Sequence, residues 1–329
     1  MNQDFKNQIY PQQLKQLQKK ALQRGIMITF IAVSLLSLWL FIAHQFGWLT
    51  GVATRTMAAW IGQMTPAISA WLMHHIGQGE GTCYGFRRPT LKWLFRGWIL
   101  GIGLPSAAFG VTGFFGWGSF ASSWSDMMEN IQEQGFVSLS SDVSVLLVYA
   151  LFSLFVVPLL LTFFALGEEI GWRGYLLSQL LVFGRRKALL LSGLLWSVWH
   201  IPLVLVGQAY PGHTVAGLLL IFPFITGVGV ILGHLRLSSQ SVWIPSLAHG
   251  TFNAQMAGPA AVSVSASSPV TGGFMGVAGI LVIWTIVCGC CGNNNLLKGV
   301  RVRVTSGSSH LLTDEVNWSF VHKKWYTYT

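Results

Sequence analysis

The chain has 329 residues, of which 52% are hydrophobic and only 9% are charged. An ordinary soluble domain is about 25% charged, so this composition excludes the usual soluble fold. The formal net charge of +10 does not indicate nucleic-acid binding, because most basic residues lie at the ends of apolar segments, as orientation signals do in membrane proteins.

Eight apolar segments are candidates for membrane-spanning helices, which need about 20 residues each. In chain order they cover residues 25–48, 57–77, 93–116, 143–166, 188–206, 214–234, 242–257 and 273–291. The second segment contains Pro66, and the seventh is short. The predicted fold class is therefore all-α, a polytopic transmembrane helical bundle with about eight spans.

Composition divides the chain into three regions. Residues 1–24 are basic and rich in Gln, and we expect them to lie along the cytoplasmic membrane surface. Residues 25–291 form the transmembrane domain, and its first apolar run is too long for a cleaved signal peptide. Residues 292–329 form a cytoplasmic tail whose segments "GVRVRVTSGSSH" and "VNWSFVHKKWYTYT" alternate like short β-strands.

The distribution of charge predicts the orientation of the chain. With the N-terminus in the cytoplasm, every Lys and Arg except Arg55 and Arg173 falls in a cytoplasmic segment. The largest outer loop, around residues 117–142, contains acidic residues and no basic ones. The positive-inside rule therefore places both termini in the cytoplasm, at the plasma (inner) membrane if the chain is bacterial.

The cysteines do not have the spacing of a metal site. Cys288, Cys290 and Cys291 lie at the end of the last apolar segment, and no second pair of ligands stands at a zinc-finger spacing. Packing or acylation explains them better than zinc or a disulfide framework.

Ionisable residues inside apolar segments are rare and costly, and here they occur in three motifs. In the first, Glu169 and Arg173 are four residues apart, so they can pair on one helix face. Glu168 is rotated from Glu169 by about 100° and can point elsewhere. The pair could be a structural ion pair, or it could hold one carboxylate while the other reacts.

The second motif contains His200, and the third contains His249 and Asn253 one helical turn apart. Each could be a packing residue or an interhelical hydrogen bond. Their distances from the predicted helix ends, about 18 Å for His200 and about 12 Å for His249 at 1.5 Å per residue, allow them to meet Glu168. We therefore expect one buried, cytoplasm-facing pocket.

Two kinds of chemistry suit these groups. A carboxylate beside imidazoles can act as a general base on water, while imidazole and amide donors stabilise an oxyanion. Alternatively, Glu168, His200 and His249 can hold Zn²⁺ with one position left for water. Either arrangement suits hydrolysis of a peptide bond inside the membrane.

These motifs resemble those of the CPBP family, which includes CAAX prenyl endopeptidases and the bacteriocin-processing or immunity (Abi) proteins. They read "EEIGWR" at 168–173, "WSVWH" at 196–200 and "HGTFN" at 249–253, in the family's order. The resemblance covers roughly residues 60–290. Trp196 stands where the family usually has Phe.

The resemblance implies an intramembrane endopeptidase with a cytoplasm-open cavity, with membrane lipids and a protein or peptide substrate as partners. It implies that Glu168 activates water with His200 as its partner, and that Glu169 and Arg173 orient Glu168. The resemblance also implies that His249 and Asn253 form an oxyanion hole or complete a metal site. The enzyme would then be either metal-free or a zinc metalloprotease. The alternatives are a non-enzymatic membrane scaffold or immunity protein of the same fold, and a transporter that relays protons.

Overall fold

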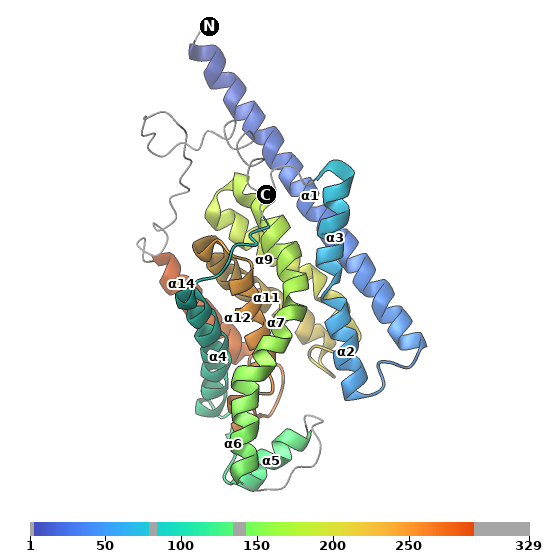
Figure 1. The fold of residues 1–329 in the computed structure, drawn as a ribbon, viewed down its shortest axis with the longest axis vertical. Coiled ribbons are helices and arrows are strands. Elements are labelled where there is room, and N and C mark those ends of the chain that lie inside the picture. The colour runs from blue at the N-terminus through green and yellow to red at the C-terminus, as the bar shows by residue number, and fades with distance from the viewer. Residues whose placement is uncertain (1–2, 79–83, 134–142, 293–329) are drawn as a thin grey trace.

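The structure, a computed structural model, describes residues 3–78, 84–133 and 143–292. Within these residues the protein is a bundle of helices with one small pair of strands (Figure 1). The all-α class predicted from the sequence is therefore confirmed. The strand-like tail predicted beyond Gly292 lies outside the described residues.

Five helical stretches are long and apolar enough to cross a membrane, by length and composition. They lie in α1 (Gln3–Gln45), α4 (Leu91–Phe114), a continuous stretch from α6 to η4, the pair α9 (Arg185–Trp199) and α10 (Ile201–Leu205), and α11 (Thr214–Ser239). The continuous stretch consists of α6 (Val143–Leu151), η2 (Phe152–Val156), α7 (Val157–Glu169), η3 (Ile170–Leu176), α8 (Leu177–Leu180) and η4 (Leu181–Phe183). These stretches coincide with five predicted spans, and the protein is an integral membrane protein.

The other three predicted spans are made of shorter helices. Residues 57–77 fall on α2 (Val52–Gly62), α3 (Thr65–Met73) and η1 (His74–Gln78). Pro66 is the second residue of α3, and proline suits a first helical turn but not a helix interior. The seventh and eighth fall on α12 (Trp243–Gln255) and α14 (Val277–Gly292). The number of spans, eight, stays a prediction.

Helix α12 lies inside the bundle, in contact with α7, α4 and α11. All of its residues except Trp243 and Asn253 are buried. Since protein rather than lipid surrounds it, α12 does not need the length of a lipid-exposed span. This position explains why the third motif, which α12 carries, is enclosed on most sides.

Two glycines allow the motif helices to pack backbone against backbone. A Cβ atom at Gly250 would lie 2.5 Å from the Thr162 nitrogen on α7, and one at Gly171 would lie 2.5 Å from the Pro66 Cβ on α3. Real Cβ atoms do not approach so closely, so only glycine fits. The helix that carries the first motif is therefore clamped between α3 and α12.

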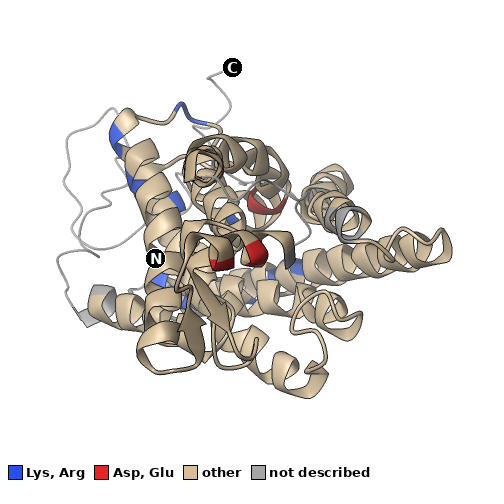
Figure 2. Ribbon diagram, turned by 90° about the horizontal axis from the view of Figure 1, so that it is seen from below, with Lys and Arg blue, Asp and Glu red and all other residues tan. Residues whose placement is uncertain are grey.

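The surface of the bundle is apolar. Large side chains such as Phe30 and Phe163 are 71% and 65% exposed, as side chains that face lipid would be. Figure 2 shows that most of the ribbon carries no charge and that charged residues are confined to a few places. The apolar segments thus form the outside as well as the inside of the bundle, as a bilayer requires.

One end of the bundle, here called the strand end, is built from outer loops. Strands β1 (Gly118–Phe120) and β2 (Val264–Ala266) pair antiparallel there, beside α5 (Trp124–Glu133) and α13 (Pro259–Ser263). Thr112, near the end of α4, accepts a hydrogen bond from the Gly273 N–H. In Figure 1, α5 lies at the opposite end of the molecule from the N-terminus.

The other end, here called the basic end, holds the starts of α4, α9 and α12. The Ser241 hydroxyl donates to the Arg87 carbonyl at 2.7 Å, which joins the segments before α12 and α4. Arg185, the first residue of α9, donates to Ser238 in the last turn of α11 at 3.3 Å. The predicted orientation puts the basic end in the cytoplasm and the strand end outside.

The close contact at Gly250 gives a stability prediction. Gly250→Ala places a methyl group against the α7 backbone, so we expect it to lower the free energy of unfolding by about 1–3 kcal/mol. Gly103→Ala is the matched control, because nothing lies within 4 Å of a Cβ atom there. Thermal unfolding in detergent measures both variants, and equal unfolding midpoints for the two would contradict the packing described.

Candidate active site

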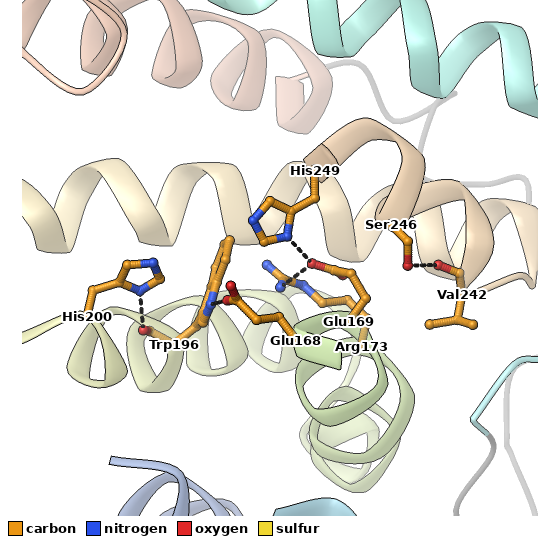
Figure 3. Close-up of polar contacts among 8 residues, drawn as sticks. All are labelled: Glu168, Glu169, Arg173, Trp196, His200, Val242, Ser246 and His249. Carbon is orange, nitrogen blue, oxygen red and sulfur yellow. Dashed lines mark hydrogen bonds and ion pairs between the residues drawn. The ribbon is translucent and has the colours of Figure 1, made fainter. Parts of the chain in front are cut away.

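The three motifs meet inside the bundle, as Figure 3 shows. Glu168 and Glu169 are the last residues of α7, and Arg173 follows in the π-helix η3. His200 caps the end of α9, and His249 projects from α12. The structure therefore brings the first motif and both histidines together, as the sequence predicted.

Glu169 is the most highly connected of these side chains. Its Oε1 atom accepts a hydrogen bond from Arg173 Nη1 at 2.9 Å and another from His249 Nδ1 at 3.0 Å. Glu169 is fully buried and Arg173 is 1% exposed. The pair predicted from the i, i+4 spacing exists, and it also joins α7 to α12.

The helical segment that follows Glu169 and contains Arg173 is wider than an α-helix. Residues Ile170–Leu176 form a π-helix, which contains Arg173. Such segments are uncommon and often occur at functional sites, because the extra residue per turn redirects side chains. The sequence did not predict this widening, since the spacing of the motif also fits an α-helix.

Trp196 stands between His200 and Glu168 (Figure 3). Its indole N–H donates to Glu168 Oε2 at 2.7 Å, and the Arg173 guanidinium carbon lies 3.9 Å from its ring centre. The rings of His200 and His249 meet its ring edge-on at 5.2 Å and 5.4 Å. A Phe at this position, as is usual in the family, would keep the ring contacts but lack the donor to Glu168.

The contacts of the histidines define which nitrogen atoms carry hydrogen. His200 Nδ1 lies 3.0 Å from the Trp196 carbonyl oxygen, which can only accept, so Nδ1 carries the hydrogen and Nε2 of the neutral ring has the lone pair. His249 Nδ1 likewise donates to Glu169. Both Nε2 atoms therefore remain for a water molecule or a substrate.

A cavity of about 330 Å³ lies against these groups. Its lining includes Trp196, His200, His249 and Asn253, and Asn253 is one of the two partly exposed residues of α12. The remaining wall is mostly apolar: Ala59, Leu203, Gln208, Ala209, Phe224, Ile225, Val228, Phe252, Met256, Phe274 and Met275. Glu168 is 2% exposed and accepts a hydrogen bond from the indole of Trp196, which is part of the cavity wall.

The position of the cavity in the bundle bears on the predicted orientation. Its lining residues 208–209 and 274–275 belong to the strand end, where the Tyr210 hydroxyl donates to the Met275 carbonyl at 2.6 Å. The predicted orientation places this end outside the cytoplasm. With cytoplasmic termini this cavity would lie toward the outer side, because the helices that carry the histidines run from the basic end toward the strand end. The side on which the cavity opens stays a prediction.

The side chains do not fit the zinc alternative as they lie. Among the residues that the structure describes, no group of three His, Cys, Asp or Glu side chains could hold a metal ion. The predicted set of Glu168, His200 and His249 does not form such a group, although the hydrogen bonds of the two histidines leave their Nε2 atoms unused. No step below involves a metal.

Some residues of the site were not predicted from the sequence. Gln208 lies in "GQAYPGH", which reads as a loop, and Phe224 and Phe274 lie in apolar runs without a distinguishing pattern. The sequence contains one signal for Gln208: it is a polar residue close to an aromatic one, in a short loop next to a motif helix.

The fold and the site together define the class: an integral membrane protein with a buried Glu–Arg–His cluster beside an apolar cavity. Residues 145–255, less than half of the chain, match the family model described as "Type II CAAX prenyl endopeptidase Rce1-like". This range contains all three motifs. The resemblance to the CPBP family is thereby confirmed.

A curated relative agrees with this family. The chain is 44% identical over 52 residues to the protein named "CAAX prenyl protease 2" of Methanococcus maripaludis. The match covers 16% of this chain and 19% of the relative. Since the aligned part is a small share of both proteins, activity and substrate are treated below as proposals.

The orientation of the two ends can be tested by labelling. In a chain whose own cysteines are changed to Ser, Ser267→Cys lies at the strand end and Thr90→Cys at the basic end, both at exposed positions. We expect a membrane-impermeant maleimide to label Ser267→Cys in intact cells and Thr90→Cys only after permeabilisation. The opposite pattern would place the cavity on the cytoplasmic side.

Proposed function

We propose that the protein is an intramembrane endopeptidase that hydrolyses a peptide bond of a membrane-associated protein or peptide. The observation that carries the proposal is the convergence of His200, His249 and Asn253 on one apolar cavity, with Glu168 bonded to Trp196 in the cavity wall and Glu169 held separately by Arg173. A purely structural ion pair would not need the two histidines and the amide around a space.

The charges of the cluster balance in a way that suits this reaction. Arg173 compensates Glu169, so an ionised Glu168 requires one further positive charge, which a protonated His249 supplies. In that state His249 Nδ1–H donates to Glu169 and its Nε2–H is a second donor. The cluster then holds two negative and two positive groups and no net charge.

The proposed reaction uses one water molecule. The oxygen of the water attacks the peptide carbonyl carbon while Glu168 takes a proton from the water. The His200 Nε2 lone pair orients the water. The carbonyl oxygen becomes an oxyanion, and His249 Nε2–H and the Asn253 amide donate to it. Glu168 then gives its proton to the leaving nitrogen as the carbon–nitrogen bond breaks.

The Trp196 indole supports the role of Glu168, rather than Glu169, as the base. By donating to Glu168 Oε2, it fixes the side chain so that Oε1 is available to the water. A fixed base avoids reorganisation during the reaction, which is a large part of what such sites contribute. We therefore propose Glu169, Arg173 and Trp196 as positioning residues.

The wall of the cavity supports an apolar substrate. Apolar side chains predominate, and the named lining residues include no Lys or Arg. The family description names prenyl endopeptidases, and the relative is named a CAAX prenyl protease. We propose that the substrate is a peptide that reaches the site from the membrane, with an apolar group attached or adjacent. We also propose that the termini of the protein are cytoplasmic.

Removal of the base tests the proposal. Two internally quenched peptides of one sequence, ending in Cys, two aliphatic residues and a final residue, are compared with and without a prenyl group on the Cys. We expect Glu168→Gln to lower kcat/KM at least about 10³-fold, because the amide cannot take a proton. Exposed Glu129 on α5 provides the control, and Glu129→Gln should keep full activity.

Full cleavage by purified Glu168→Gln would contradict the mechanism. If wild-type protein binds both peptides and cleaves neither, the result favours a non-enzymatic scaffold of the same fold.

A further inference from the structure

Gln208 lines the cavity and has a buried amide nitrogen without a hydrogen-bond partner among the described residues. This nitrogen is Nε2, and Gln208 lines the same space as His200, His249 and Asn253. It lies outside the three motifs and outside the cluster of charges. The reaction proposed above does not use it.

The segment that carries Gln208 is fixed rather than loosely placed. The backbone N–H groups of Gln208 and Ala209 both donate to the Leu203 carbonyl, at 2.9 Å and 3.1 Å. Gly207 has φ +73°, which glycine adopts without strain. Further along, the Tyr210 hydroxyl donates a hydrogen bond to the Met275 carbonyl. The turn therefore holds the amide against the cavity.

A buried donor without a partner is costly, and another glutamine of this bundle shows the ordinary solution. Gln255 on α12 is 2% exposed, and its Nε2 donates to the Ser153 carbonyl at 2.9 Å. Gln255 thus joins two helices and is structural. Since Gln208 Nε2 has no such partner among the described residues, a ligand that enters the cavity is a candidate to satisfy it.

The chemistry of the wall indicates which ligand atom fits. An amide N–H donates to an oxygen acceptor, and the named lining residues include no Lys or Arg that would favour a carboxylate. We propose that Gln208 donates a hydrogen bond to a backbone carbonyl oxygen of the substrate peptide, at a residue other than the one cleaved. This inference rests on the proposed function, and it makes Gln208 a substrate-binding residue.

Steady-state cleavage and thermal unfolding of three proteins test it: wild type, Gln208→Leu, and Gln255→Leu as the matched control. For Gln208→Leu we expect KM to rise about tenfold with kcat within about twofold, because a uniform binding contact is lost. Its unfolding midpoint should equal or exceed that of wild type. The midpoint of Gln255→Leu should fall, because its replacement leaves the Ser153 carbonyl unpaired.

Two results would overturn the inference while leaving the protease intact: an unchanged KM for Gln208→Leu, or a fall in its unfolding midpoint as large as that of Gln255→Leu. A peptide with an amidated C-terminus separates the two oxygen acceptors. If amidation raises the KM of wild type tenfold but not that of Gln208→Leu, the partner is the terminal carboxylate and the backbone carbonyl is wrong. If wild type cleaves no peptide, the proposed function fails and this inference fails with it.

Discussion

The site depends on one carboxylate oxygen, Oε1 of Glu169, which accepts from both Arg173 and His249. In a low-dielectric interior a single buried charge is strongly unfavourable, so the guanidinium and the carboxylate must be buried together or not at all. The imidazole adds a contact from a different helix. This interaction therefore fixes the direction of α12 relative to α7, and with it the place of His249 and Asn253 beside the cavity.

The surrounding packing serves the same arrangement. Gly250 lets α12 approach α7 closely, and Gly171 lets the π-helix η3 rest on Pro66. Trp196 fills the space above the guanidinium and donates to Glu168, so the second carboxylate is held without a charged partner of its own. The result is two adjacent glutamates with different environments, one in an ion pair with Arg173 and one hydrogen-bonded to Trp196 in the cavity wall. Proposals about catalysis follow from that difference.

Much of this could be predicted from the sequence, because burying a charge in an apolar helix is costly enough to mark its position. The all-α class, the Glu169–Arg173 pair and the convergence of Glu168, His200 and His249 follow from that rule and from helical spacing. The full lining of the cavity did not follow, since it depends on how the segments at 208–209 and 274–275 fold back onto the bundle. The role of Trp196 was also hidden, because an aromatic residue in an apolar helix looks like ordinary packing. The shortness of α12 became meaningful only once its neighbours were known.

The central claim is that Glu169 and Arg173 act as one buried unit, and a double-mutant cycle measures it most directly. The free energy of unfolding in detergent is determined for wild type, Glu169→Gln, Arg173→Met and the double variant. Each single change leaves one buried group uncompensated and should cost about 3–5 kcal/mol. The account predicts that the double variant is far less destabilised than the sum of the two, with a coupling of at least about 2 kcal/mol. Additive effects would contradict it, because they would mean that the two side chains are stabilised independently.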